Sequence, residues 1–321
     1  MHVSFRQLQL FLALADQGSI SAAARACHVT QPTVSMQLKE LSETLGLPLY
    51  EQVGKRLFLT QAGEELARSA RNMVDEWSGL TQRIDAMKGL QRGRLRVSVV
   101  STAKYFVPRM LGAFCQRHPD IDIALQVLNR DGVLQRLRDN LDDLCIMSMP
   151  PTDLDIEQQV FMPNPLVVIA PATHRLAGVK NIELSELANE RFILRERGSG
   201  TRLAGDAHLS ELGFKPQVRL ELGSNEAIMQ AVAGGLGLAL VSEHALGEHR
   251  VDEALTVLDV KGFPMHAHWY MVYLKGKRLS PLAAAFHSYL GAQAAQAAAQ
   301  LASQAGAWPG GGHANEISSP S

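Results

Sequence analysis

Two sets of side chains in this chain have types and spacings that could do chemistry. One set, between residues 31 and 39, places hydroxyl, amide and ammonium groups on one face of a predicted helix. The other set, between residues 101 and 225, brings hydroxyls, amides and guanidinium groups to the ends of predicted β-strands. Groups of the first kind suit the base edges and phosphates of DNA, and groups of the second kind suit a small anion.

Residues 31–45 form a predicted helix with two unlike faces. Its apolar face repeats every three or four residues and consists of Val34, Leu38, Leu41 and Leu45. Its opposite face is slim and consists of Pro32, Thr33, Ser35, Met36 and Lys39. The hydroxyls of Thr33 and Ser35 can contact bases or phosphates, while Met36 offers only apolar contact and Lys39 suits a phosphate. This face predicts a recognition helix that enters a major groove roughly 12 Å wide.

Two shorter helices and a hairpin are predicted around this face. The first helix carries an apolar stripe formed by Phe5, Leu8, Phe11, Leu12 and Ala15. The second helix follows Ser19, a suitable N-cap, and is so rich in alanine that another helix can cross it closely. Together with residues 31–45 it predicts a helix-turn-helix. Residues 49–60 predict two short strands around Gly54, a wing with Lys55 and Arg56 at its tip.

Net charge does not identify a nucleic-acid partner. The chain has 31 Lys and Arg residues against 32 Asp and Glu residues, a formal net charge of −1. Residues 1–60 carry five basic and four acidic side chains. The placement of the cations on the helix face and the wing therefore favours DNA binding, and a helical subdomain that serves only packing is the alternative.

Residues 61–90 predict one long helix, which Thr60 is placed to cap. At 1.5 Å per residue it is roughly 40 Å long. Its apolar residues follow a heptad pattern: Leu66, Ala70, Met73, Trp77, Leu80, Ile84 and Met87. A narrow apolar seam with charged flanks indicates a dimer, which would present two DNA-binding domains to a two-fold site. The alternative is that the seam packs on the chain's own α/β domain.

Short β-branched runs alternate with helical stretches from Arg94 to about Leu290, which predicts an α/β fold. The predicted strands are Leu95–Val100, Ile121–Leu128, Leu144–Ser148, Leu166–Ala170, Phe192–Leu194, Val218–Leu222, Leu238–Val241 and His268–Leu274. The predicted helices are Tyr105–Arg117, Gly132–Asn140, Thr201–Leu212, Asn225–Ala233 and Pro281–Ala302. Residues 291–321 form a low-complexity tail, in which Ala292–Ala302 extend the last helix and the rest is predicted to be disordered.

Polar residues gather where the predicted strands end, which is where open α/β sheets bind ligands. Hydroxyl and amide groups come from Ser101, Thr102, Asn129, Thr201 and Asn225. Positive charge comes from Lys104, Arg130, Arg195 and Arg202, and Gly198 and Gly200 allow close backbone approach. Each residue alone is better explained as a helix cap or a solvated side chain than as part of a pocket. Their convergence predicts a site for a phosphorylated or carboxylated metabolite.

The N-terminal pattern is more specific than helix-turn-helix geometry. Residues 5–63 contain F-x-Q-L-x-x-F-x-A-L-A-x-x-G-S-x-S-A-A-A, then V-T-Q-P-T-V-S-x-Q-L-K-x-L, then L-x-E-Q-x-G-K-R-x-x-L-T-x-A-G. This pattern resembles the winged helix-turn-helix of LysR-type transcriptional regulators. The resemblance implies that the operator is contacted by Gln31, Pro32, Thr33, Ser35, Met36, Lys55 and Arg56. Many members carry Arg where Met36 stands, so this chain departs from the family pattern there.

The resemblance also implies how the chain assembles and what it binds. The long helix would pair two subunits antiparallel, and two dimers would form a tetramer. Double-stranded promoter DNA and RNA polymerase would be the partners. The α/β part would be an effector domain that resembles type 2 periplasmic binding proteins, with two lobes around a cleft.

The implied domains are a winged helix-turn-helix (1–60), a linker helix (61–90) and an effector domain (94–290). The first lobe would comprise about 94–163 and 267–290, and the second about 164–266. The effector-site positions that match the family pattern are Ser101, Thr102, Asn129, Gly200, Thr201 and Asn225.

Within the family, S-T-A-K-Y-F-x-P-R and R-E-x-G-S-G-T-R resemble the CbbR branch. Those regulators control Calvin-cycle genes for carbon dioxide fixation. They sense metabolites such as ribulose 1,5-bisphosphate, phosphoenolpyruvate, ATP or NADPH. All of these are anions, in agreement with the cationic strand ends.

Other classes find less support in the sequence. His266 and His268 would share one side of a strand, but no third metal ligand lies at a suitable spacing, and no catalytic motif such as G-x-S-x-G is present. We therefore expect neither an enzyme, a metal site nor a cofactor. Three cysteines, no apolar run of roughly 18 residues and no secretory N-terminus predict a cytoplasmic protein without a membrane partner. The alternative function is a solute-binding α/β protein whose N-terminal region serves only assembly.

Overall fold

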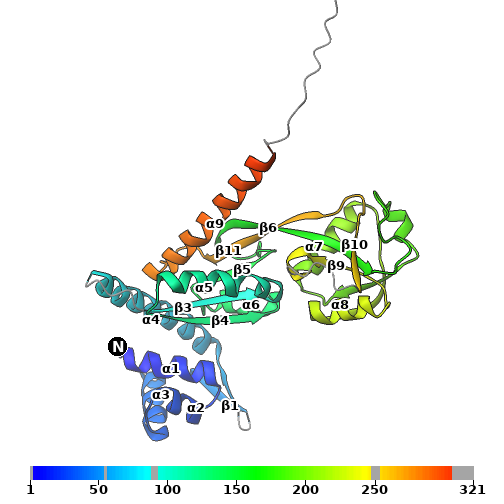
Figure 1. Cartoon of the computed structure of the whole chain (residues 1–321). Helices are drawn as coiled ribbons and strands as arrows, with labels where there is room; N and C mark the ends of the chain where they lie inside the picture. The colour runs from blue at the N-terminus through cyan, green and yellow to red at the C-terminus, as the bar shows by residue number, and fades with distance from the viewer. Residues whose placement is uncertain (1–2, 54–55, 88–92, 247–253, 306–321) are drawn as a thin grey trace, which may run out of the picture.

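The computed structural model describes residues 3–53, 56–87, 93–246 and 254–305. A small N-terminal domain is followed by one long helix and then by an elongated α/β body with two lobes (Figure 1). The predicted fold class, a winged helix-turn-helix joined by a linker helix to a two-lobed α/β domain, is confirmed.

The N-terminal domain contains three helices and a two-stranded wing. Its elements are α1 (Phe5–Gln17), α2 (Ile20–Ala26), α3 (Gln31–Leu45), β1 (Tyr50–Val53) and β2 (Arg56–Leu59). Hydroxyl groups cap the helices: Ser19 Oγ accepts the Ala22 N–H at 3.2 Å, and Thr30 Oγ1 accepts the Thr33 N–H at 3.4 Å. The wing strands pair antiparallel, as predicted.

The predicted apolar stripe of α1 is partly wrong. Phe5 is exposed, whereas Leu10 and Leu14, which the stripe omits, are buried. The physical reason is that α1 contacts α2, α3 and the long helix, so a wider arc of its surface is covered than one neighbour would cover.

The long helix, α4 (Gln61–Met87), starts against the wing. The Thr60 hydroxyl accepts the Gly63 N–H at 3.1 Å and donates to the Pro48 carbonyl at 2.6 Å, so the predicted cap is confirmed. A Cβ on Gly63 would lie 1.9 Å from the Leu49 carbonyl oxygen. Only glycine therefore lets this first turn pack directly on the wing's backbone.

The heptad seam of α4 leaves its middle part uncovered. Ala70 is buried, but Met73 and Trp77 are more than half exposed, and Leu80 and Ile84 are also exposed. A single chain therefore does not satisfy the seam. Among the described residues no helix, α4 included, is long and apolar enough to cross a bilayer.

The α/β body is built on one nine-stranded sheet with the order β4-β3-β5-β11-β6-β9-β7-β8, and β10 pairs with β6. Its strands are β3 (Gly93–Val100), β4 (Ile121–Leu128), β5 (Leu144–Met147), β6 (Ile156–Pro171), β7 (Arg191–Arg195), β8 (Gln217–Leu222), β9 (Leu238–Ser242), β10 (Leu255–Leu258) and β11 (Met265–Leu274). Its helices are η1 (Ser101–Tyr105), α5 (Val107–Arg117), α6 (Arg130–Arg138), η2 (Leu184–Leu187), α7 (Gly200–Glu211), α8 (Asn225–Ala233), η3 (Glu243–Leu246) and α9 (Pro281–Ala305).

Several predicted boundaries differ from the structure. β6 begins at Ile156, ten residues before the predicted start at Leu166. The prediction starts too late because the largely exposed first half of this strand lacks an apolar alternation and contains Pro163 and Pro165. Of the helix predicted from Tyr105, Tyr105 itself ends η1, and α5 begins at Val107 with Pro108 in its first turn. β10 was not predicted, and α9 continues to Ala305. The predicted disordered end of the tail, residues 306–321, lies outside the described residues.

Separate clusters of core residues divide the body into two lobes. The first lobe is built on β3, β4, β5 and the first half of β6, with Phe114, Trp269 and Phe286 among its buried side chains. The second lobe is built on β7, β8, β9 and the end of β6, with Phe192 and Ile228 in its cores. β6 and β11 are the long strands that pass between the lobes (Figure 1).

A polar joint connects α4 to the first lobe. Arg96 on β3 donates to Asp75 of α4 at 2.7 Å and to Asp143 at 2.9 Å. Lys277, largely buried, donates to the side chain of Asn140 at 2.6 Å, and Asn140 donates to α4. Burial lowers the pKa of Lys277, and the pull of the neighbouring carboxylates opposes this shift. The linker helix is thus attached to the first lobe through a charged network.

Candidate DNA-binding surface and effector site

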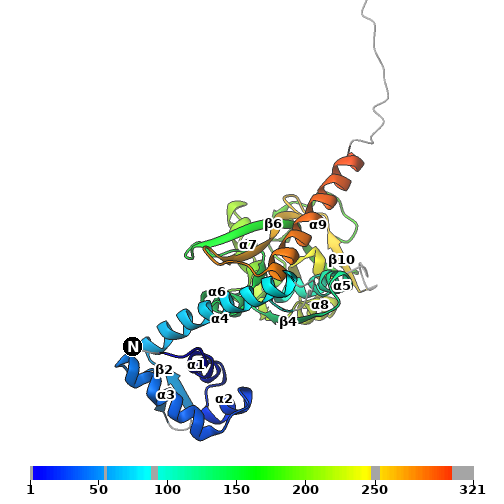
Figure 2. The same cartoon turned by 90° about the vertical axis from the view of Figure 1, so that its left-hand side faces the viewer.

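The outward face of α3 is open to solvent. Three members of its apolar face, Val34, Leu38 and Leu41, have no exposed surface, and the fourth, Leu45, is half-buried at the end of the helix. On the other side Met36 is 60% exposed, and Gln31, Pro32 and Lys39 are exposed as well. Figure 2 shows this domain at the end of α4 remote from the α/β body. The predicted division of the helix into two faces is therefore what the structure has.

The polar groups of this face make few and weak contacts within the chain. Thr33 and Thr30 hydroxyls lie 2.8 Å apart, and Ser21 donates to the Gln31 side chain at 3.2 Å. Lys39 lies 3.7 Å from Glu43, and both side chains are exposed. Ser35 is half-buried. Such groups can exchange their contacts for DNA at little cost.

The two wing cations are less fully described. Lys55 lies outside the described residues. Arg56 begins β2 and pairs with Val53 through the backbone, and its side chain lies outside the described part of the chain.

Arg195 is the centre of the second candidate site. It ends β7 in the second lobe, and its side chain is 2% exposed. Its Nη2 donates to Ser101 Oγ at 3.1 Å and its Nη1 to Thr102 Oγ1 at 3.4 Å, both in η1 of the first lobe. Nη1 also donates to Asn225 Oδ1 at 3.0 Å, at the start of α8. The guanidinium therefore joins the two lobes through residues from three separate strand ends.

Glu196 completes the coordination of Arg195. Arg195 Nε donates to Glu196 Oε2 at 2.7 Å, and Nη2 donates to Oε1 at 2.9 Å. This is the parallel two-bond geometry in which a guanidinium binds a carboxylate most strongly. A negative group is thus already placed where an anionic ligand is predicted to bind.

A second contact between the lobes lies at the rim of this cluster. Lys104 Nζ lies 2.7 Å from Glu226, and the Tyr105 hydroxyl donates to the same carboxylate at 2.8 Å. Burial alone would raise the pKa of Glu226, but hydrogen bonds from Lys104, Ser224 and Tyr105 lower it to about 2. Burial and the bond to Glu226 raise the pKa of Tyr105.

The glycines of the β7–α7 loop meet side chains of the first lobe. Gly198 has a φ of +88°, and a Cβ there would lie 2.7 Å from Asp131 Oδ2. A Cβ on Gly200 would lie 2.9 Å from Ser148 Oγ. These two glycines therefore let the loop backbone approach side chains of the first lobe, and their predicted part in an effector site stays a prediction.

The remaining predicted effector residues make their contacts outside the hydrogen-bond partners of the Arg195 guanidinium, although Arg202 Nη1 donates to the Arg195 backbone carbonyl at 3.0 Å. Asn129 caps α6 by accepting the Gly132 N–H at 2.9 Å, and Arg130 Nε donates to the Met149 carbonyl at 2.9 Å. Arg202 donates to Asp206 at 2.6 Å and to Glu221 at 3.0 Å, so its charge is balanced inside the second lobe. Thr201 is buried in the first turn of α7.

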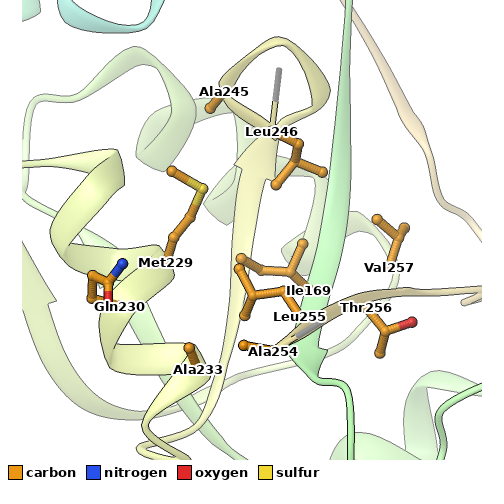
Figure 3. Close-up of a pocket in the computed structure, with 10 residues that line it drawn as sticks. All are labelled: Ile169, Met229, Gln230, Ala233, Ala245, Leu246, Ala254, Leu255, Thr256 and Val257. Atoms are coloured by element: carbon orange, nitrogen blue, oxygen red, sulfur yellow. The ribbon is translucent and has the colours of Figure 1, made fainter. Parts of the chain in front are cut away.

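A separate depression of about 310 Å³ lies in the second lobe between α8, η3 and β10 (Figure 3). Ile169, Met229 and Leu255 contribute to its apolar lining, and Gln230 and Thr256 are polar groups in it. None of the described lining residues is charged. This depression does not match the predicted anion chemistry.

Sequence reasoning missed the acidic and aromatic members of the site. Glu196 stands next to Arg195, and Glu226 next to Asn225, so adjacency was an available signal. A search for cations that would bind an anion passes over acidic residues. Among the described residues no group of three or more His, Cys, Asp or Glu side chains could hold a metal ion, and His266 and His268 are exposed.

Comparison with protein families identifies both parts of the chain. The model of the bacterial regulatory helix-turn-helix protein, lysR family, matches residues 5–64. The LysR substrate binding domain model matches residues 88–295. The two models together cover the winged domain and both lobes, and most of the linker helix α4 lies between the two matched segments.

Individual relatives agree with this match. The transcriptional activator CmpR of Synechocystis is 45% identical over 90% of this chain and 95% of its own length. The RuBisCO operon transcriptional regulator of Acidithiobacillus ferrooxidans is 44% identical over 92% of this chain and 95% of its own. The Synechocystis CcmR regulatory domain, solved in complex with 2-PG, superposes with a TM-score of 0.60 at 48% identity, over 62% of this chain and 96% of that chain. This chain belongs to the LysR family of DNA-binding transcriptional regulators.

Proposed function

We propose that this regulator controls carbon dioxide fixation genes and that a small phosphorylated or carboxylated metabolite changes its activity by binding at Arg195. Two relatives over 40% identical, an activator named CmpR and a RuBisCO operon regulator, support the choice of genes. The related CcmR domain binds 2-PG, 2-phosphoglycolate, which carries a phosphate and a carboxylate.

The buried Arg195 guanidinium is the observation that supports the effector site most strongly. It donates hydrogen bonds to Ser101 in the first lobe and to Asn225 in the second lobe. An anion that binds this guanidinium is therefore linked to both lobes. Since β6 and β11 pass between the lobes, a change in their relative angle bends these two strands. A ligand with different affinities for two lobe arrangements shifts their populations.

The joint at Asp75 offers a route from the lobes to the DNA. Arg96 lies on β3, the strand that leads directly to Ser101 and Thr102. A movement of β3 therefore reaches α4 through the pair of Arg96 with Asp75. In a dimer paired along α4, such a movement changes how the two wings meet the DNA and how far the DNA bends.

The proposed operator contacts are Gln31, Pro32, Thr33, Ser35, Met36 and Lys39 on α3, with Lys55 and Arg56 on the wing. The exposed seam of α4 is proposed to pair two subunits, and pairs of dimers to form a tetramer that contacts RNA polymerase. The protein would act in the cytoplasm, where promoter DNA is located. The match of residues 5–64 to a regulatory helix-turn-helix argues against a solute-binding protein that uses this region only for assembly.

Fluorescence anisotropy with duplex DNA from upstream of the neighbouring divergent gene tests the DNA-binding surface. Ser35→Glu places a carboxylate on the outward face of α3, and we expect at least about a 100-fold loss of affinity because it faces phosphates. Thr44→Glu adds the same charge nine residues further along α3, roughly 13 Å away, and should retain the affinity within about threefold. Equal losses in both variants would remove this face from the operator contact.

The effector proposal is tested on the wild-type complex. Addition of 2-phosphoglycolate should change the electrophoretic mobility or the footprint of the bound promoter DNA. An identical complex with and without this metabolite would reject it as the effector and leave the DNA-binding assignment in place.

A further inference from the structure

We infer that Glu196 is an internal competitor of the effector: its carboxylate holds the anion-binding edge of Arg195, and the effector's phosphate or carboxylate must displace it. This inference rests on the proposed function of the Arg195 cluster. It adds a specific residue that sets the affinity for the effector.

The donors of Arg195 are fully engaged. A guanidinium has five N–H groups on three nitrogens. Nε donates to Glu196, Nη2 donates to Glu196 and Ser101, and Nη1 donates to Thr102 and Asn225. The side chain is 2% exposed, so solvent does not supply a free direction of approach. A further anion can bind this group only if one of the present partners leaves.

Glu196 is the partner that can leave most easily. Thr102 and Asn225 are at least 95% buried, and the Asn225 amide donates to the Thr102 hydroxyl at 3.2 Å, which holds the pair in place. The Glu196 side chain is 27% exposed and follows the end of β7. Rotation about its side-chain torsions carries the carboxylate into solvent, where it is well solvated.

Charge balance explains why displacement rather than simple addition is expected. A buried guanidinium without a counter-ion is strongly disfavoured, and Glu196 supplies that counter-ion. Two anions on the same edge would repel each other at short range in a medium of low dielectric constant. Binding is therefore an exchange of one charge-assisted pair for another, and the net affinity is the difference between them. A phosphate dianion, with more charge than Glu196, is favoured in such an exchange.

The test measures binding of 2-phosphoglycolate to the full-length chain by isothermal titration calorimetry. Glu196→Gln keeps the size of the side chain and removes its charge. We expect affinity to rise on the order of 10- to 100-fold, since one of two competing charge-assisted pairs is lost. Glu221→Gln is the matched control: Glu221 is also in the second lobe and pairs with Arg202 at 3.0 Å, so this variant removes one negative charge without freeing Arg195. It should change the affinity by less than about threefold.

The outcomes separate the inference from the proposed function. If wild type binds 2-phosphoglycolate and Glu196→Gln binds it equally or more weakly, Glu196 is not a competitor and the inference is wrong. Equal gains in Glu196→Gln and Glu221→Gln would also overturn it, because a general charge effect would explain both. Binding by Glu196→Gln alone would support it. If neither wild type nor Glu196→Gln binds 2-phosphoglycolate or inorganic phosphate, the effector site at Arg195 and the inference both fail.

Discussion

The outward face of α3 and the Arg195 cluster are both polar, but they are built in opposite ways. The α3 face comes from a single stretch of the chain, residues 31–39. Gln31, Pro32, Met36 and Lys39 are exposed there, and the ion pair of Lys39 with Glu43 spans 3.7 Å between exposed side chains. The Arg195 cluster comes from η1, β7 and α8, its central side chain is 2% exposed, and a bidentate ion pair fills its donor edge. The first surface is available to a partner as it stands, and the second has to exchange a partner it already holds.

This contrast has an energetic meaning. Exposed polar groups lose little when a contact is broken, so changes on the α3 face should alter DNA binding and leave folding intact. Buried polar groups are stabilised by their partners, so changes inside the body should alter folding and ligand binding together.

Leu38 and Met36 lie two residues apart on opposite faces of α3. Leu38→Ala should destabilise the N-terminal domain by about 2–5 kcal/mol, because it leaves a cavity at a fully buried position. Met36→Ala should change stability by less than about 0.5 kcal/mol and affect DNA binding instead. Urea unfolding followed by circular dichroism measures both. Comparable losses of stability in the two variants would show that the faces of α3 are not divided as described.

Asp75 tests the joint between α4 and the first lobe. Asp75→Ala should cost about 1.5–3 kcal/mol, because it removes a charge-assisted hydrogen bond to Arg96 and a carboxylate beside the largely buried Lys277. The urea midpoint of the first-lobe transition measures this loss. The control is Glu76→Ala, which removes an exposed carboxylate paired with Arg83 on the same helix and should cost under about 1 kcal/mol. A joint that makes no contribution would give equal midpoints for the two variants.

Trp77 tests whether the exposed seam of α4 is a subunit interface. Trp77 is 56% exposed, and the centroid of its ring lies 5.9 Å from that of Phe5. Because so much of this side chain is uncovered, Trp77→Ala should affect association far more than folding. We expect the dimer dissociation constant to rise about 30-fold, equivalent to about 2 kcal/mol for a central aromatic interface residue. Analytical ultracentrifugation over a range of concentrations measures it. An unchanged sedimentation profile would place the interface elsewhere.

Glu226 lies at the rim of the Arg195 cluster, and the loss of its charge should have the smallest effect on stability. Its pKa is about 2 in the folded chain, below its ordinary value of 4.5, so its pairing with Lys104 and Tyr105 stabilises the fold above about pH 4.5. This contribution should be lost as the pH falls from 4.5 towards 2. Since the side chain is about half exposed, we expect less than about 1 kcal/mol.

The measurement is the thermal midpoint of wild type and Glu226→Gln between pH 7 and pH 3. The difference between the two proteins should be largest at neutral pH and shrink below about pH 4.5. A difference that stays constant over this range would show that the charge of Glu226 does not stabilise the lobes.

Sequence periodicity is sufficient to predict which residues are buried where burial depends on the residues of a single helix or strand. The faces of α3 and the wing strands depend on neighbours within about seven residues, and both appear in the structure as predicted. The predicted long helix is present as α4, while pairing of two subunits along its exposed seam stays a prediction. The predicted α1 stripe omits Leu10 and Leu14, which are buried because three other helices, rather than one, cover α1.

The members of the Arg195 cluster were predictable only in part. Ser101, Thr102, Arg195 and Asn225 were named from strand ends, because the ends of parallel strands meet at one edge of a sheet. Arg202 was placed in the same group from its neighbouring motif, yet its guanidinium is held by Asp206 and Glu221. Sequence shows that an arginine is close to a site but not which carboxylate it will pair with, since several are within reach of its long side chain.

The winged helix-turn-helix, the linker helix and the alternation of strands and helices are predictable from the residues alone, because they follow from local periodicity and capping. Three features emerge only from the folded chain: β6 and β11 connect both lobes, Arg96 ties α4 to the body, and Glu196 pairs with Arg195. These features join residues that are distant in the chain or choose among equivalent charges. Their free energies depend on burial and distance, which local sequence does not specify.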